Sequence, residues 1–292
     1  MVAENVFQGG LFTSDFLQES IANVIDWQNL ADSEIDRLAI DLQQIFDRFP
    51  ISHTANESQT EDDLIWPILA RLGWTASLRQ QNLAARGRDD VPDGLLFQND
   101  AAKTEANAFR EEWKRYDFGL AIVESKRWQR PLDRQSGRRG EETAPSTQML
   151  RYLRRVEDLT TGKLRWGILT NGARWRLYYQ GAQSVSEHFF EIDLAAVLAI
   201  PGHDGGLFAL SDDQRRHWLK VLPSLSDETH LFRRLAIRER SINGPSKKVA
   251  STRSASPQIC LTLFSGRCFL SWHPLSLQRR RPRPFKKYGK RL

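Results

Sequence analysis

The sequence predicts a mixed α/β protein with one central sheet flanked by helices. Three observations support this fold class: helical patterns dominate the chain up to residue 74, five strand-like runs follow between residues 91 and 192, and one helical stretch separates the second run from the third. This order is typical of a mixed sheet wrapped by helices. Hydrophobic residues make up 40% and charged residues 27% of the 292, which is enough apolar material for a sizeable core.

Helical spacing characterises the first part of the chain. Residues 15–49 carry apolar side chains at intervals of three and four with little Gly or Pro, and they predict two helices. Residues 57–74 (ESQTEDDLIWPILARLGW) follow, with acidic residues at the start and Gly73 at the end, as helix termini prefer. Pro67 predicts either a kink in this helix or its true first turn.

Strand-like runs then alternate with one helix. The Asn171-Gly172 pair predicts a hairpin between the third and fourth runs. Pro145 stands at the start of an amphipathic stretch that predicts a helix over 145–159. The predicted strands are residues 91–97, 118–126, 164–170, 174–179 and 189–192.

Charge divides the chain unevenly. Residues 245–292 hold 12 of the 42 Lys and Arg and none of the 36 Asp and Glu, so the preceding residues have a net charge of −6 despite a total of +6. We therefore predict four parts: an N-terminal helical segment (1–50), an α/β core (51–200), a helical connector (201–244) and a basic, disordered tail (245–292). The tail is either a non-specific DNA-binding extension or a truncated or out-of-frame end.

Two predicted strands carry charge inside apolar runs. Asp93 is the third residue of VPDGLLF (91–97), and Glu124 and Lys126 lie in GLAIVESKRW (119–128). Residues two apart on a strand share a face, so Glu124 and Lys126 point together while Ser125 points away. Buried charges are costly without partners, and pairing of the two strands would bring Asp93 to Glu124.

This combination of groups suits phosphodiester hydrolysis. Carboxylate oxygens are the ligands that Mg²⁺ prefers, and Mg²⁺ fills its remaining positions with water and substrate phosphate. Lys126 beside the metal would orient or deprotonate a water and stabilise charge on the phosphate. The plainer alternative is a surface pair of Glu124 with Lys126, with Asp93 in a turn. Gln148 and Tyr152 add two polar side chains on one face of the predicted helix.

Together these pieces resemble the PD-(D/E)xK nuclease superfamily. Pro92-Asp93 matches PD, residues 124–126 match ExK, and Gln148 with Tyr152 matches QxxxY. The surrounding text, including IVESKRW, STQMLRYL and WGILTNGARWRLYY, is similar to the N-terminal cleavage region of combined restriction–modification enzymes (type IIG), and type I restriction subunits carry a related region. The resemblance covers residues 56–198, and the ordered set is more specific than any single motif.

The resemblance implies a restriction-endonuclease-like fold and a role for each matched residue. Asp93 and Glu124 would be metal ligands for Mg²⁺, with Mn²⁺ as a substitute, and Lys126 the catalytic lysine. Gln148 and Tyr152 would support the site from the helix. The family often has an acid on its first core helix, for which Glu57 fits best and Glu61 is the rival; either acid has a plainer reading as a helix-capping residue.

The predicted partner is double-stranded DNA. The RGRDD stretch places Arg86 and Arg88 just before Asp93, where they would either contact a DNA phosphate or lie in a solvated loop. No methyltransferase amine-binding motif, glycine-rich cofactor loop or nucleotide phosphate loop is present. Recognition of a DNA sequence would therefore come from missing residues, from a partner such as a methyltransferase or specificity chain, or from nowhere.

The expected function is that of a Mg²⁺-dependent DNA endonuclease domain, a fragment or stand-alone relative of restriction–modification enzymes. The alternatives are an inactive DNA-binding or protein-interaction remnant, and a nuclease of repair or recombination. No run approaches the roughly 20 apolar residues of a membrane span, and the N-terminus lacks the pattern of a secretory signal. We therefore expect a cytoplasmic protein without membrane partners.

Overall fold

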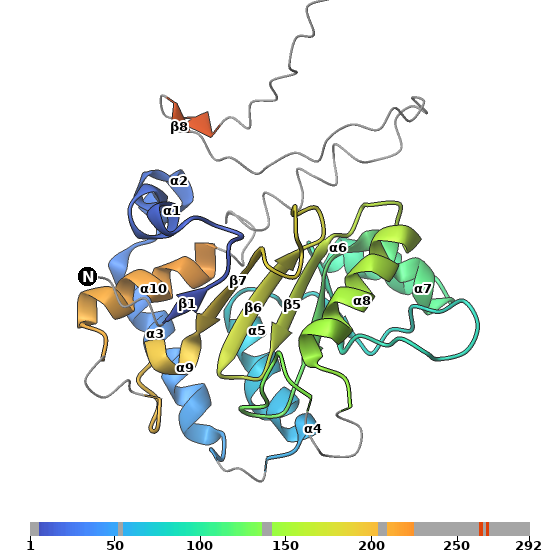
Figure 1. The fold of residues 1–292 in the computed structure, drawn as a ribbon, viewed down its shortest axis with the longest axis horizontal. Helices are drawn as coiled ribbons and strands as arrows, with labels where there is room; N and C mark the ends of the chain where they lie inside the picture. The colour runs from blue at the N-terminus through green and yellow to red at the C-terminus, as the bar shows by residue number, and fades with distance from the viewer. Residues whose placement is uncertain are drawn as a thin grey trace, which may run out of the picture. The chain divides into compact units, whose positions relative to one another are not determined.

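The computed structural model describes residues 6–51, 55–135, 142–203 and 209–224, and two short strands further on (Figure 1). The chain divides by its internal contacts into two units, residues 1–258 and 259–292. In the second unit, β8 (Leu263–Phe264) pairs antiparallel with β9 (Arg267–Cys268). The rest of the predicted basic tail, and residues 225–244 of the predicted connector, lie outside the described residues.

A seven-stranded mixed sheet forms the centre of the first unit, which confirms the predicted α/β class. Its strand order is β1–β7–β6–β5–β4–β3–β2, and all neighbours are antiparallel except β4 and β5. The strands are β1 (Phe7–Gln8), β2 (Ser77–Arg79), β3 (Gly94–Phe97), β4 (Gly119–Ser125), β5 (Trp166–Thr170), β6 (Arg174–Tyr179) and β7 (Phe189–Asp193).

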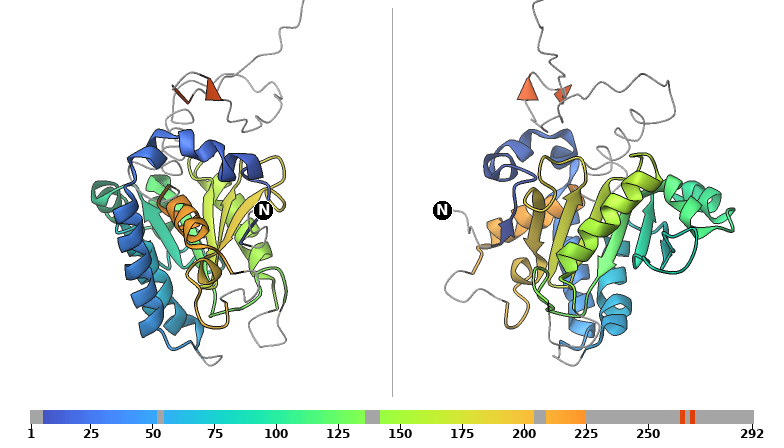
Figure 2. Two further views of the ribbon diagram at one scale, coloured as in Figure 1. Left: turned by 90° about the vertical axis from the view of Figure 1, so that its left-hand side faces the viewer. Right: turned by 45° about the vertical axis from the view of Figure 1, so that its right-hand side comes forward.

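Helix α8 (Pro145–Leu159) makes the crossover that the parallel β4–β5 pair requires (Figure 1). It lies close to the sheet because Gly167 of β5 has no side chain: a Cβ there would lie 2.7 Å from the sulfur of Met149. Gly94 of β3 projects to the opposite face, where its Cβ would meet the Trp66 ring at 2.5 Å. Helices therefore cover both faces of the sheet, as the two views of Figure 2 show.

The predicted helix over residues 57–74 is interrupted. It consists of α4 (Glu57–Thr60), the π-helical turn η2 (Glu61–Ile65) and α5 (Trp66–Arg71). Pro67 has no N–H to donate and its ring excludes the carbonyl of the preceding turn, so the backbone widens into a π turn just before it. Pro67 thus marks the first turn of α5, one of the two outcomes predicted for it.

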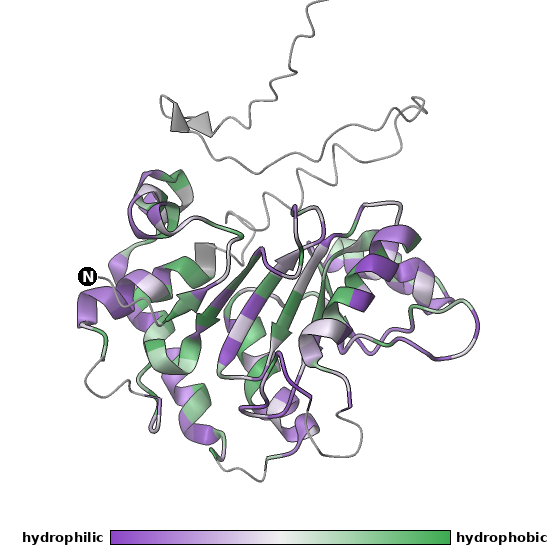
Figure 3. Cartoon of the chain, in the orientation of Figure 1, coloured by the Kyte–Doolittle hydropathy of each residue, from purple (hydrophilic) through white to green (hydrophobic). Residues whose placement is uncertain are grey.

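The helical region predicted over residues 15–49 is divided into shorter helices. Residues 15–49 form four helices instead of two: α1 (Ser14–Gln18), η1 (Ser20–Asn23), α2 (Ile25–Asn29) and α3 (Asp32–Arg48). The others are α6 (Asp100–Asn107), α7 (Glu112–Arg115), η3 (Tyr116–Phe118), α9 (Leu194–Val197) and α10 (Asp212–Ser224). Apolar residues follow the central strands and polar residues the outer helices (Figure 3). None of the described helices is long and apolar enough to cross a lipid bilayer.

Candidate active site

The antiparallel register of β3 and β4 brings the two predicted acids together. Gly94 lies opposite Val123 and Leu95 opposite Ile122, so extending the pairing by one residue sets Asp93 opposite Glu124. Asp93 is half-buried, while Glu124 has only 2% of its surface exposed. Directly opposed residues of an antiparallel pair lie about 5 Å apart at Cβ, so their carboxylates repel each other.

Lys126 joins these acids at the end of β4. Its backbone N–H donates to the carbonyl of Thr170 at 2.8 Å, which extends the β4–β5 pairing by one residue. Its Nζ donates to Glu124 Oε1 at 2.5 Å and lies 3.6 Å from Glu57 Oε1. Glu57, Asp93, Glu124 and Lys126 form what we call the charged cluster. Its lysine is only 4% exposed, so the interaction is not a solvated surface pair.

Burial dominates the electrostatics of the charged cluster. It raises the pKa of Glu124 to about 8, with the Asp93 charge adding to the rise and Lys126 opposing it. It also raises the pKa of Asp93 to about 6, opposed by Lys126 and reinforced by Glu61. For Lys126, burial lowers the pKa, but the surrounding carboxylates outweigh burial and the net pKa is raised. The lysine is therefore held charged among acids that ionise reluctantly.

Ser125 contributes to the site, contrary to the expectation that it points away. Its backbone N–H and its hydroxyl both donate to Asp93 Oδ2, at 2.7 and 2.8 Å. The alternation rule fails here because Asp93 precedes β3 and lies in a bend, so its carboxylate is free to turn towards the serine. Both hydrogen bonds lower the pKa of Asp93 and fix one of its oxygens.

The two rival acids of the first core helix have different partners. Glu57 is 3.6 Å from Lys126 Nζ and 3.9 Å from a guanidinium nitrogen of Arg130. Glu61 is buried and binds Arg79 at 2.7 Å. Glu57 therefore belongs to the charged cluster, whereas Glu61 is engaged in an ion pair with β2 and acts on the cluster through its charge on Asp93.

Gln148 and Tyr152 lie together on α8 as their spacing predicts. Gln148 Nε2 donates to the Tyr152 hydroxyl at 2.9 Å. Burial raises the pKa of Tyr152, and the nearby Glu124 charge adds to the rise, so the tyrosine lies within electrostatic reach of the charged cluster. No direct hydrogen bond joins the described Tyr152 or Gln148 side chains to Glu124 or Asp93.

The donor set suits a hydrated divalent ion more than a closed metal cage. Among the described residues, no group of three or more His, Cys, Asp or Glu side chains is arranged to hold a metal. Glu124 Oε2 is nevertheless buried without a hydrogen-bond partner in this part of the chain, and an unsatisfied buried carboxylate oxygen is costly. Mg²⁺ typically takes one or two carboxylates and keeps several waters, so Asp93 and Glu124 fit such an ion.

Other charged and aromatic residues near the motifs have separate roles. Trp128 packs against Phe46 and Phe49, with ring centroids 5.9 and 5.6 Å apart, and therefore serves the core. Asp90 and Arg130 are both buried, and sequence reasoning missed them, since a charged residue in a loop gives no sign of burial.

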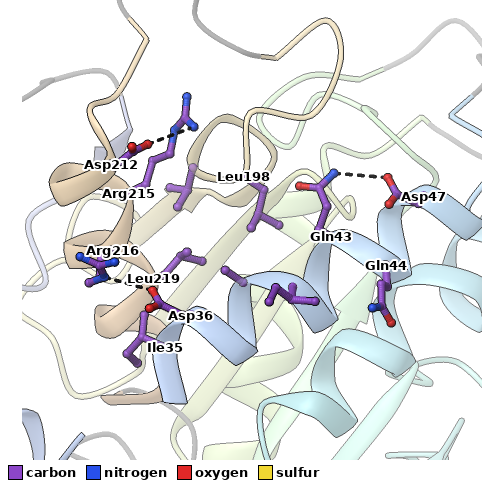
Figure 4. Close-up of a pocket in the computed structure, with 13 residues that line it drawn as sticks. Ile35, Asp36, Gln43, Gln44, Asp47, Leu198, Asp212, Arg215, Arg216 and Leu219 are labelled. Atoms are coloured by element: carbon purple, nitrogen blue, oxygen red, sulfur yellow. Dashed lines mark hydrogen bonds and ion pairs between the residues drawn. The ribbon is translucent and has the colours of Figure 1, made fainter. Parts of the chain in front are cut away.

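A groove of about 530 Å³ opens elsewhere on this unit (Figure 4). Helices α3, α9 and α10 line it with apolar side chains such as Ile35 and Leu219 and with ion-paired ones such as Asp36 and Arg216. It shares no residue with the charged cluster, and its acids are already engaged: Asp36 and Asp212 pair with arginines, and Asp47 accepts a hydrogen bond from Gln43. It therefore offers no comparable set of reactive groups.

Comparison with known proteins gives no identification. No family model, curated protein or solved structure matches the chain. The functional argument therefore depends on the geometry of the charged cluster and on the motifs themselves.

Proposed function

We propose that this chain is a Mg²⁺-dependent DNA endonuclease domain of the restriction type, with a restriction-endonuclease-like fold. The observation that carries the proposal is the buried charged cluster, in which Lys126 binds Glu124 at 2.5 Å and the strand register sets Glu124 against Asp93. A protein keeps two repelling acids and a lysine buried at the ends of its strands at a cost in stability. Such clusters of perturbed pKa values mark functional sites.

Each group has a role in this proposal. A divalent ion held by Asp93 and Glu124 would stabilise negative charge on a phosphate and acidify a bound water. Lys126 would place its ammonium beside the scissile phosphate, where it orients the attacking water and stabilises negative charge on the phosphate oxygens. Glu57 forms a second ion pair with Lys126, in addition to that of Glu124. Tyr152 and Gln148 are polar side chains of α8 that would orient waters or phosphate oxygens at the site.

The direct test is nicking of supercoiled plasmid DNA with Mg²⁺ or Mn²⁺ against a chelator. We expect nicking only with the ion, and a loss of at least about 100-fold for Glu124→Gln or Lys126→Met, as for removal of a general acid–base group. Asp62→Asn is a matched control, because Asp62 is an exposed acid of η2 that does not belong to the charged cluster. A Glu124→Gln variant that cuts as well as the parent would refute the assigned chemistry.

A second candidate is a non-catalytic DNA-binding or interaction module. The observation in its favour is that, among the described residues, no three His, Cys, Asp or Glu side chains are arranged to hold a metal ion. Titration calorimetry with Mn²⁺ separates the two candidates: saturable binding that Glu124→Gln abolishes supports the enzyme, and its absence in the parent supports the module.

The setting of this activity is also proposed. A restriction nuclease needs its host DNA marked, so a methyltransferase or specificity chain is the expected partner, and the site of action is the cytoplasm. Copurification of such a chain with the tagged protein from its native cells would test this association.

A further inference from the structure

The loop between β2 and β3 (residues 80–93) leads directly into the charged cluster and carries two arginines near its middle. Arg86 and Arg88 are both exposed. Neither has a hydrogen bond, ion pair or ring contact with any described residue. Asp93, the predicted metal ligand, is the last residue of the same loop, so the loop is joined directly to the charged cluster.

One side of this loop is fixed to helix α8 through Asp90. The Asp90 carboxylate is 4% exposed, lies 3.0 Å from Arg151 Nη2 and forms a second ion pair with Arg155. Its backbone carbonyl accepts a hydrogen bond from Leu83 N–H at 2.9 Å, across the loop. A buried carboxylate with two guanidinium partners resists displacement. The segment from Asp90 to Asp93 is therefore held in place against α8.

The other side of the loop is fixed to α7 and η3. The Tyr116 hydroxyl donates to the Gln81 carbonyl at 2.6 Å, and Arg115 donates to the Gln81 side chain at 2.6 Å. Asn82 N–H donates to Glu112 at 2.7 Å. The tip is closed by Asn82 Nδ2, which donates to the carbonyl of Gly87 at 2.6 Å. Gly87 has φ +77°, a conformation that favours glycine.

The contrast between a fixed stem and two unpartnered cations indicates a binding surface. Guanidinium groups bind phosphate oxygens with two parallel hydrogen bonds. A loop that is already ordered loses less conformational freedom on binding than a flexible one. Arg86 and Arg88 flank Gly87, and the Asp89 carboxylate lies next to that glycine, with its oxygens 3.6 Å from where a Cβ would be.

We propose that residues 80–93 form a clamp for the DNA backbone, in which Arg86 and Arg88 bind phosphates of the duplex whose scissile phosphate lies at the charged cluster. This inference rests on the proposed function. Asp90 is a positioning residue that holds the clamp against α8. Because phosphates carry no base identity, the clamp sets the register of the strand without reading sequence.

The test is equilibrium binding of a fluorescent DNA duplex, measured by anisotropy with chelator present so that no cleavage occurs. We expect Arg86→Ala and Arg88→Ala each to weaken binding by roughly threefold to tenfold, and to lower the slope of log Kd against log salt concentration by about 1. The lysine variants Arg86→Lys and Arg88→Lys should keep the slope and lose only part of the affinity.

Arg37→Ala is the matched control. Arg37 is an exposed arginine of α3 that has no hydrogen bond or ion pair with the described residues, and its removal changes the net charge equally. If Arg37→Ala weakens binding as much as Arg86→Ala, the effect is one of net charge and the clamp is refuted. If neither loop variant differs from the parent, the clamp is also refuted.

Trypsin supplies a second measurement that does not depend on cleavage of DNA. The fixed loop should resist tryptic cutting after Arg86 and Arg88, and Asp90→Asn should accelerate it at least several-fold. Bound duplex should slow cutting of the parent at these two sites. If bound duplex leaves the rate of tryptic cutting at these sites unchanged, the clamp is contradicted.

Failure of the clamp and failure of the proposed function give different results. A parent that binds DNA and nicks plasmid, with loop variants that bind equally well, removes the clamp alone. A parent that neither binds nor nicks DNA removes the proposed function and the clamp with it.

Discussion

Ser125 holds Asp93 by two hydrogen bonds to one carboxylate oxygen, at 2.7 Å from its N–H and 2.8 Å from its hydroxyl. Only the second depends on the side chain. We expect Ser125→Ala to cost about 1 kcal/mol of stability and to weaken divalent-ion binding by roughly tenfold, because Asp93 loses part of its orientation. Calorimetry and thermal unfolding measure both effects.

Thr170→Ala is the control for this prediction. Thr170 lies opposite Ser125 in the β4–β5 pair, and its buried hydroxyl accepts a hydrogen bond from Gly172 N–H. It should lose similar stability without weakening ion binding. Equal ion affinity in the Ser125→Ala variant and the parent would show that the serine does not position Asp93.

The acids of the charged cluster make stability depend on pH. The folded-state pKa of Glu124 is about 8 and that of Asp93 about 6, both above ordinary values near 4. Between the ordinary pKa near 4 and the folded-state pKa of Glu124, the folded protein therefore binds more protons than the unfolded chain. Its stability without metal falls as pH rises from about 4 to about 8. Glu124→Gln should flatten this dependence and be more stable than the parent at pH 8. Denaturant unfolding at several pH values checks both statements.

Divalent ions should reverse that loss. Binding requires ionised carboxylates, so the apparent affinity for Mn²⁺ should increase as pH rises to about 8. The increase in Tm on adding the ion should then be larger at pH 8 than at pH 6. Glu124→Gln should show no such difference. A Tm increase that is the same at both pH values, or that persists in the variant, would contradict binding at these acids.

Glu57 and Glu61 should respond in opposite ways to the same substitution. Glu57 is partly exposed beside Lys126, so Glu57→Gln should lower plasmid nicking by roughly tenfold or more with little change in stability. Glu61 is buried against Arg79, so Glu61→Gln should cost roughly 1 to 2 kcal/mol. Parallel assays of nicking and denaturant unfolding separate the two, and a stable but inactive Glu61→Gln variant would reverse the assignment.

Arg176 stabilises the sheet beyond the site. It is 2% exposed, binds Glu191 at 2.6 Å and Asp133 at 2.7 Å, and stacks on Phe189. Arg176→Met would leave the buried Glu191 carboxylate without its main partner, and should cost about 3 kcal/mol or more.

The control for Arg176 is on the same strand. Arg174 is 52% exposed and pairs with Asp193 at 3.4 Å, so Arg174→Met should cost less than about 1 kcal/mol. Similar losses from the two substitutions in denaturant unfolding would show that the buried network does not stabilise the fold.

Much of the fold follows from local pattern. The predicted helix over 145–159 matches α8 from end to end, because Pro145 fixes its start and apolar spacing sets its face. The strand at Arg174–Tyr179 also matches. The two-residue β1 has no pattern of its own and exists only by pairing with β7, so sequence reasoning missed it, along with β2.

The candidate site was predictable where it depends on strand geometry. Glu124 and Lys126 share a face because they are two residues apart, and the partner acid is Asp93 because its strand is adjacent. The role of Ser125 was not predictable, since it depends on the bend at Asp93. Glu57 and Glu61 could not be separated either, because a regular helix would place them one turn apart on the same face, and the π turn that begins at Glu61 has no sequence signal except Pro67.

The pairing of β1 with β7 also constrains the order of folding during synthesis. Phe7 must wait for Ile192, which leaves the ribosome some ten seconds or more later at ordinary elongation rates. Strands β3 and β4, next to the charged cluster, emerge earlier, and their neighbours β2 and β5 lie much nearer to them in the sequence than β7 does to β1. The half of the sheet that carries the charged cluster therefore has time to assemble before the edge strand closes, and a nascent chain stalled between β5 and β7 should already protect its β3–β4 amides from exchange.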